Sequence, residues 1–243
     1  MARVEDLIEQ ALKSVGDKPP DSANREVKKK YSEQISAAVA NAVADELRHR
    51  GLVGARPAPP GITGDTGAER RMAGGIGAKK VDVTWATEES GLLLGISVKS
   101  INYRDKRTGN FQKNLTNRRG DMLIEAVTLH RRFPYSVLAG LFFIDKEAEN
   151  DGTPRRKSTF LNAHQRLKLF TGRDDPAGRD EQFERFYLIL LDAGSLHANV
   201  RAFSVGDSAK VVPIDVIIDD LIELVAIRNP DFYEVEAGRL VKI

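Results

Sequence analysis

Two adjacent strand patterns constrain the fold of this chain more than any other feature of its sequence. Residues 79–85 and 92–100 are rich in apolar and β-branched side chains, and Ser90-Gly91 between them is a turn signal. A two-residue turn at that point makes the two segments an antiparallel hairpin. In the register that this turn sets, Asp82 lies opposite Lys99.

The hairpin is expected to have one apolar and one polar face, because side chains alternate along a strand. The apolar face carries Val81, Val83, Trp85, Ile96 and Val98. The polar face carries Asp82, Thr84, Ser97 and Lys99. A slip of one residue would move Asp82 into the apolar face, so burial favours this register.

The hairpin belongs to an α/β unit in the middle of the chain. A helix is predicted over 31–50, a Gly- and Pro-rich loop over 51–78, and, after the hairpin, a basic loop, a helix and an apolar strand over 101–116, 117–132 and 136–144. This order predicts an α/β fold with a mixed central sheet flanked by helices. The expected organisation is an N-terminal extension (1–30), a core (31–144) and a C-terminal extension of the same domain (145–243).

Charge is distributed unevenly along the chain. Residues 99–119 hold seven bases and one acid, and residues 155–173 hold six bases and no acid. Residues 214–236, which overlap an amphipathic helix predicted over 213–228, hold seven acids and one base. The two basic segments predict a phosphate-binding surface, although solvated loops give the same pattern. The C-terminal third, with further strands predicted over 186–191 and 199–205, is expected to serve an interface or recognition.

Composition excludes several kinds of chemistry. The 243 residues include no cysteine, which excludes disulfides, cysteine-bound zinc, iron–sulfur clusters and thiol nucleophiles. The first residues are charged and lack the apolar core of a secretory signal. No apolar run reaches about 18 residues, so neither a transmembrane helix nor a membrane partner is expected. A cytoplasmic location is the simplest expectation.

An aspartate beside a lysine on a rigid hairpin suits phosphodiester hydrolysis. The carboxylate of Asp82 can hold a divalent cation that takes oxygen ligands, and Lys99 can orient the attacking water and offset charge in the transition state. The alternative is a cross-strand ion pair, which is common and contributes about 0.2–1 kcal/mol.

The segments KKVDVTW and GISVKS, placed between a preceding helix and a following helix and strand, resemble the core of the PD-(D/E)XK nuclease superfamily. That superfamily includes most Type II restriction endonucleases and many repair and phage-defence nucleases. The resemblance implies a restriction-endonuclease-like α-β-β-β-α-β core over roughly 31–144. Asp82 matches the first acid of the family pattern, and Lys99 matches its lysine.

The second acid of the pattern is missing, because Ser97 stands in its place. A subset of restriction enzymes has Ser-x-Lys here and supplies the carboxylate from the following helix. On the helix predicted over 117–132, Glu125 falls about 60° from Met122, at the border of the apolar face. Glu125 is therefore expected to be the migrated metal ligand. The alternative is an exposed glutamate paired with Arg118 or Arg132.

The helix predicted over 31–50 carries a second candidate acid. Glu46 falls about 20° from Ile35, in the middle of the apolar face, where a carboxylate is costly unless it is paired or liganded. Family members often have an acid on this helix at the metal site, so the resemblance nominates Glu46 as an assisting ligand. A buried salt bridge is the alternative.

The loop that leaves the second strand is the best candidate for binding DNA. It starts two residues after Lys99, and it combines cations for phosphates with amides that can contact base edges. The candidate DNA-binding residues here and in the next helix turn are Arg104, Lys106, Arg107, Gln112, Lys113, Asn114, Asn117, Arg118 and Arg119. An ordinary basic surface loop is the alternative.

The resemblance implies a Mg²⁺-dependent DNA endonuclease, with Mn²⁺ able to substitute, that cuts double-stranded DNA as a restriction or phage-defence enzyme. Asp82 and Glu125 would hold the metal with help from Glu46, and Lys99 would position the water. One site per chain suggests a homodimer for cutting both strands. The rival interpretations are a DNA-binding module whose site has decayed, marked by Ser97, and an assembly subunit of a larger complex.

Overall fold

The computed structural model describes residues 3–59 and 70–243. Its centre is a six-stranded sheet in the order β3-β4-β5-β6-β7-β8. The bounds are β3 Val83–Thr87, β4 Gly91–Ile101, β5 Val137–Asp145, β6 Arg185–Ala193, β7 Ala198–Ser204 and β8 Val211–Val212. Strands β4, β5 and β6 are parallel, and the other neighbours are antiparallel. The predicted mixed central sheet is therefore confirmed.

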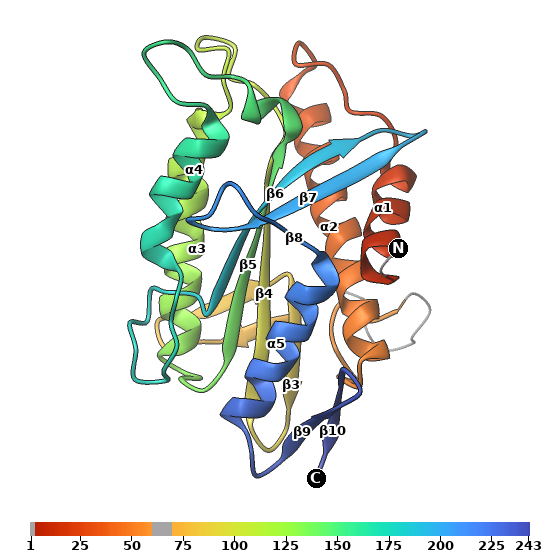
Figure 1. Ribbon diagram of the computed structural model, residues 1–243, viewed down its shortest axis with the longest axis vertical. Helices are drawn as coiled ribbons and strands as arrows, with labels where there is room; N and C mark the ends of the chain where they lie inside the picture. Colours follow the sequence, from red (N-terminus) through yellow and green to blue (C-terminus); the bar gives the residue numbers. More distant parts are fainter. Residues whose placement is uncertain (1–2, 60–69) are drawn as a thin grey trace.

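Helices cover both faces of this sheet (Figure 1). The apolar side chains of one face pack with α1 (Arg3–Val15), α2 (Arg25–His49) and α5 (Ile214–Arg228). Those of the other face pack with α3 (Leu115–His130) and α4 (Thr159–Leu167). The first face includes residues from both ends of the chain, such as Val4 and Leu240, so the segments outside 31–144 share its core. Within the described residues, no helix is long and apolar enough to cross a membrane.

The parallel strands lie in the middle of the sheet because both of their faces are covered. All nine residues of β5 are buried, which agrees with its uninterrupted apolar sequence. Strand β4 is buried over most of its length, with Lys99 as an exception near its carboxyl end. A functional group on β4 is thus held by a rigid element close to the loop that leaves it.

The register predicted for the β3–β4 hairpin is wrong by two residues. Thr87 pairs with Gly91, so the turn is formed by residues 88–90, and the ladder shifts between Trp85 and Ala86. Val83 consequently faces Ile96, where the predicted turn would place it opposite Val98. Over Val83–Trp85 the shift is even, so Val83, Thr84 and Trp85 keep their predicted faces.

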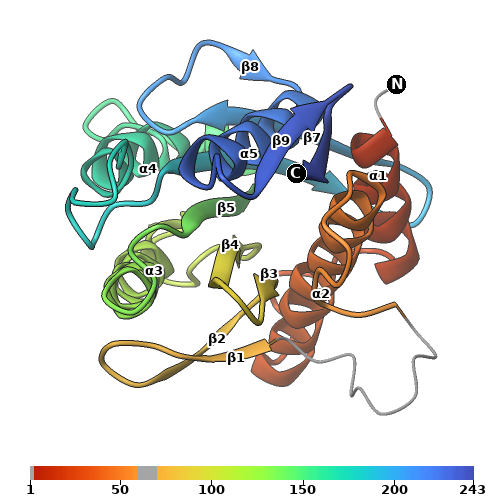
Figure 2. The same cartoon turned by 90° about the horizontal axis from the view of Figure 1, so that it is seen from below.

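The strand predicted over 79–85 is broken at Asp82. It forms β2 (Ala78–Val81) and β3, with Asp82 in a bend between them. The bend turns Val81 toward the core of the α3 side, although the alternation predicted it beside Val83 in the other core. Strand β2 pairs with β1 (Arg70–Ala73) in a separate hairpin that lies beneath the sheet in Figure 2. Part of the segment predicted as the loop 51–78 is therefore this hairpin, and residues 60–69 lie outside the described residues.

Other differences lie at the ends of elements. Helix α2 begins at Arg25, where the side chain of Asn24 caps it by accepting a hydrogen bond from Val27. The run REVKKK is charged on all sides, so its helical pattern does not show in the hydrophobic periodicity. The chain also forms short 3-10 turns and a final hairpin; these elements are η1 Gln112–Asn114, η2 Lys146–Glu149, η3 Lys168–Phe170, β9 Tyr233–Glu236 and β10 Arg239–Lys242.

Candidate active site

Asp82 and Lys99 form a direct ion pair. The Nζ atom of Lys99 lies 2.8 Å from Oδ2 of Asp82, and that oxygen also accepts the backbone N–H of Val98 at 2.6 Å. The bend at Asp82 makes this contact possible, because the carboxylate reaches to β4 from beyond the end of the β3 ladder. The predicted contact is present, but it does not come from the predicted register.

Glu125 lies on the same side of the sheet and contacts the same ammonium. Its Oε2 atom is 3.9 Å from Nζ of Lys99. The two distances to this nitrogen add up to an upper limit of about 6.7 Å between the carboxylate oxygens of Asp82 and Glu125. The side chain of Glu125 is only 2% exposed. The structure therefore does not show the exposed glutamate that was the alternative interpretation.

Two buried hydroxyls lie on the polar face of the hairpin. Ser97 and Thr84 are 1% and 0% exposed, and neither hydroxyl oxygen has a hydrogen-bond partner among the residues that the structure describes. Ser97 nevertheless lies near enough to Glu125 to favour the charged form of its carboxyl. Buried polar atoms without partners are uncommon in folded proteins, and one of these two, the hydroxyl of Ser97, lies beside Glu125.

The electrostatics of this group depend on burial and on opposed charges. Burial raises the pKa of Glu125, Asp82 raises it further, and the charges of Lys99 and Lys79 offset only part of that rise. Burial alone would lower the pKa of Lys99, but the charges of Glu125 and Asp82 outweigh it and keep the pKa above its ordinary value. Lys99 is consequently a firmly charged ammonium at neutral pH.

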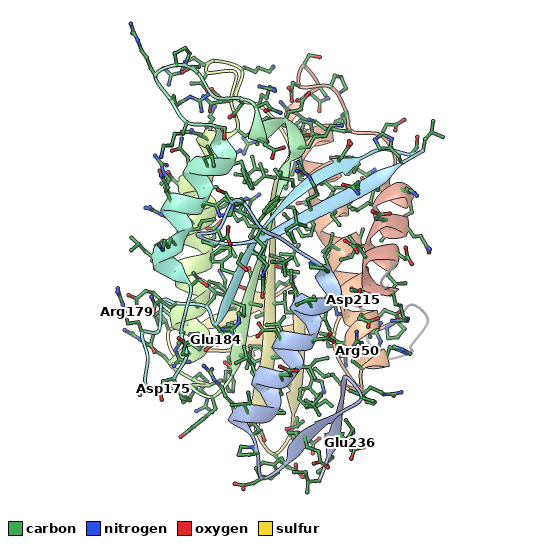
Figure 3. The ribbon with its side chains drawn as sticks, viewed as in Figure 1. Arg50, Asp175, Arg179, Glu184, Asp215 and Glu236 are labelled. Atoms are coloured by element: carbon green, nitrogen blue, oxygen red, sulfur yellow. The ribbon has the colours of Figure 1, made fainter. Side chains whose placement is uncertain are left out.

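The structure does not bring Glu46 into this group. Glu46 is 1% exposed, as its position on the apolar face predicts, but its carboxylate pairs with Arg50 at 2.7 Å and with Arg3. Arg50 in turn contacts Asp215 and Asp219 of α5. These partners belong to the opposite face of the sheet, as the positions of Arg50 and Asp215 in Figure 3 show. The nomination of Glu46 as an assisting ligand is corrected to the buried salt bridge that was its alternative.

Lys79 and Arg118 also lie at this group. Nζ of Lys79, on β2, is 4.0 Å from Oε2 of Glu125. Arg118, in the first turns of α3, is near enough to Lys99 for its charge to lower the pKa of that ammonium. Arg118 was predicted to bind DNA. The signal for Lys79 was its position two residues before Val81, on the same side of the strand.

The loop after β4 is organised around its single acid. Asp105 accepts hydrogen bonds from the backbone of Arg107 and Thr108 and from Nζ of Lys113 at 2.6 Å. The Lys113 contact is the main reason that the pKa of Asp105 falls to about 2. Arg104 pairs with Glu147 at 3.4 Å and lies over the ring of Phe111.

The remaining predicted DNA-binding residues are distributed around this loop and the start of α3. Lys106, Arg107, Asn114 and Asn117 are exposed, Gln112 is half-buried with an unpartnered Nε2 among the described atoms, and Arg119 lies over the ring of Phe170. A hollow of about 360 Å³ at the loop is lined in part by Arg107, Lys113 and Arg166. Arg166, from α4, was not predicted individually, although it belongs to the basic segment 155–173.

No family model, curated protein or solved structure matches this chain. Within residues 3–59 and 70–243, no group of three or more histidine, cysteine or acidic side chains is arranged to hold a metal ion.

Proposed function

We propose that this chain is a Mg²⁺-dependent DNA endonuclease of the PD-(D/E)XK type. The observation that carries the proposal is the convergence of Asp82, Lys99 and Glu125, which come from three separate elements, on one partly exposed point of the sheet. The chain order helix, strands, helix and parallel strand supports the same topology, because α3 connects the parallel pair β4 and β5. The missing acid at Ser97 is compensated by the neighbouring Glu125.

The residues at this point fit magnesium. Mg²⁺ is usually bound by one or two carboxylates and completes its octahedral shell with waters and substrate phosphate oxygens. Asp82 and Glu125 would hold the ion, and the buried hydroxyl of Ser97 beside Glu125 adds a polar group at the same point. When bound, the ion would activate water and neutralise charge at the phosphate.

Lys99 has the role of an electrostatic partner. Because its pKa is raised, it is protonated at neutral pH and donates hydrogen bonds. An ammonium so placed donates a hydrogen bond to the oxygen of the attacking water and thereby orients it. The same charge stabilises the negative charge that develops on the phosphoryl oxygens. Its rigid position on β4 means that little reorganisation is needed during the reaction.

The substrate is double-stranded DNA in this proposal. Arg118 and the loop with Lys106 and Arg107 provide positive charge at the same end of β4. A restriction or phage-defence nuclease in the cytoplasm, acting as a homodimer with one site for each strand, would use this arrangement.

A binding module with a decayed site is the second candidate. It is favoured by one observation, that Lys99 already lies between both carboxylates and balances part of their charge without a metal. Such a protein would bind DNA without cutting it, and Glu125→Ala would leave its affinity unchanged.

Incubation with plasmid or phage DNA, with and without Mg²⁺, followed by mapping of the ends tests the proposal. We expect cleavage that requires the metal, and rates lowered by a factor of about 10² to 10³ in Asp82→Ala and Lys99→Ala. Glu223→Ala, which removes an exposed carboxylate from α5, is the matched control and should cut normally. Cleavage at the wild-type rate by Asp82→Ala would overturn the assignment.

A further inference from the structure

The β1–β2 hairpin is fastened to α3 at its tip. It extends from below β3 toward α3 in Figure 2. The backbone N–H of Gly75 donates to the carbonyl oxygen of Thr128 at 2.8 Å. A Cβ atom at Gly74 would lie 2.6 Å from that same oxygen, so the close approach requires glycine. This contact fixes where the side chains of β2 lie relative to α3.

Lys79 is directed inward from the fastened hairpin. It pairs in register with Met72, and both Met72 and Val81 are buried in the core on the α3 side. Lys80, the next residue, is on the exposed side of the strand. The ammonium of Lys79 is thereby placed 4.0 Å from Glu125 while its side chain keeps 30% of its surface exposed to solvent.

Lys79 is the more exposed of the two lysines at the site. Its side chain keeps 30% of its surface exposed, against 17% for Lys99, and it is Lys99 that is in direct contact with Asp82. A DNA phosphate carries a negative charge, so a partly exposed ammonium beside the two carboxylates is well placed to contact it. A lysine contacts phosphate as a compact point charge with three donors, so it needs proximity rather than a fixed planar orientation.

We propose that Lys79 binds a backbone phosphate of the DNA at the cleavage site, and that the hairpin is fastened to α3 in order to hold it there. This inference rests on the proposed function, because it names the group that receives the substrate of the same site. It assigns a role to a residue outside the Asp82–Lys99–Glu125 group and to the two glycines at the hairpin tip.

Binding to a short mixed-sequence duplex without divalent metal tests Lys79 apart from catalysis. Lys79→Gln should weaken binding and lower the slope of log affinity against log salt by about 0.9, the value of one phosphate contact. Lys79→Arg should keep the slope. Lys80→Gln removes the same charge one residue away on the exposed side, and its effect should be smaller. Equal slopes for wild type and Lys79→Gln would overturn the proposal.

The glycine contact allows an independent test. Gly74→Ala should unseat the hairpin tip and reproduce the loss of slope, although Lys79 is still present. Gly77→Ala is the matched control, since a Cβ there meets nothing within 4 Å. The double variant Gly74→Ala with Lys79→Gln should lose no more than either single variant, because both remove one interaction. Additive losses would contradict the role of the hairpin.

The cleavage assay separates failure of this inference from failure of the proposed function. If Asp82→Ala and Lys99→Ala stop cleavage while Lys79→Gln cuts at the wild-type rate and binds normally, the site is catalytic and Lys79 is not part of it. If Asp82→Ala and Lys99→Ala both cut normally, the proposed function itself is wrong. A loss of about tenfold or more in single-turnover cleavage by Lys79→Gln supports both.

Discussion

Glu125 and Glu184 are both buried acids, yet their surroundings are opposite. Glu184 precedes β6 and is labelled in Figure 3. Its carboxylate accepts hydrogen bonds from Arg228 at 2.6 Å, Arg173 at 3.1 Å and the backbone of Leu138 at 2.6 Å. It also lies 3.3 Å from the ring of His130. These partners outweigh the effect of burial, so the pKa of Glu184 is lowered.

Glu125 has no such set of donors in the described part of the chain. The cations nearest to its carboxylate are at 3.9 and 4.0 Å, and burial keeps its pKa raised. A buried carboxylate whose oxygens accept several hydrogen bonds from the protein stabilises the fold. One whose oxygens lack such donors is available to a ligand. By this criterion Glu184 and Glu46 have structural roles, and Glu125 is the acid that we propose to be functional.

The largest expected effect is on stability at Glu184. Glu184→Ala leaves the buried guanidinium groups of Arg173 and Arg228 without their carboxylate, and it should lower the free energy of unfolding by about 3–5 kcal/mol. Urea denaturation measures this loss. Glu223→Ala, at an exposed position of α5, should change it by less than about 0.5 kcal/mol. A loss of unfolding free energy below about 1 kcal/mol in Glu184→Ala would contradict the structural role that distinguishes Glu184 from Glu125.

A similar contrast, between cations that are paired with a carboxylate and cations that are not, applies to the basic loop. Arg104 and Lys113 are paired with Glu147 and Asp105, whereas Lys106 and Arg107 are exposed and show no side-chain partner in the described residues. Removing Lys106 and Arg107 together should reduce the salt slope of DNA binding by about 1.8, at 0.9 for each contact. Removing Arg104 and Lys113 should reduce it less. A larger reduction of the salt slope on removing Arg104 and Lys113 would contradict the expectation that the unpaired cations contact DNA.

The smallest expected effect is on how stability depends on pH. A raised pKa in the folded state means that ionising Glu125 costs stability as pH rises above the ordinary value of 4.5. Glu125→Gln removes that cost, so its stability relative to wild type should increase with pH. Glu184 has the opposite sign, because its stabilisation is lost as pH falls through its lowered pKa. Urea denaturation at several pH values measures both trends.

The sequence predicted the mixed sheet. It also predicted that Asp82 and Lys99 lie close together, but the contact arises from the bend at Asp82 and not from the predicted strand pairing. It could not predict the bend at Asp82 or the three-residue turn, because these depend on how β2 and β3 pack against different partners. Helical periodicity placed Glu125 and Glu46 correctly as acids at or within apolar faces. Periodicity cannot show which side chains pack against the apolar face of a helix. It therefore could not distinguish Glu46, which pairs with Arg50, from Glu125, which lies near Lys99.

Single-turnover cleavage of DNA by Glu125→Gln is the most direct test of the central claim, that the open buried carboxylate belongs to a magnesium-dependent active site. The change keeps the shape of the side chain and removes only its charge. We expect a folded protein that cuts about a hundredfold or more slowly than wild type in Mg²⁺. Cleavage by Glu125→Gln at the wild-type rate would contradict the account.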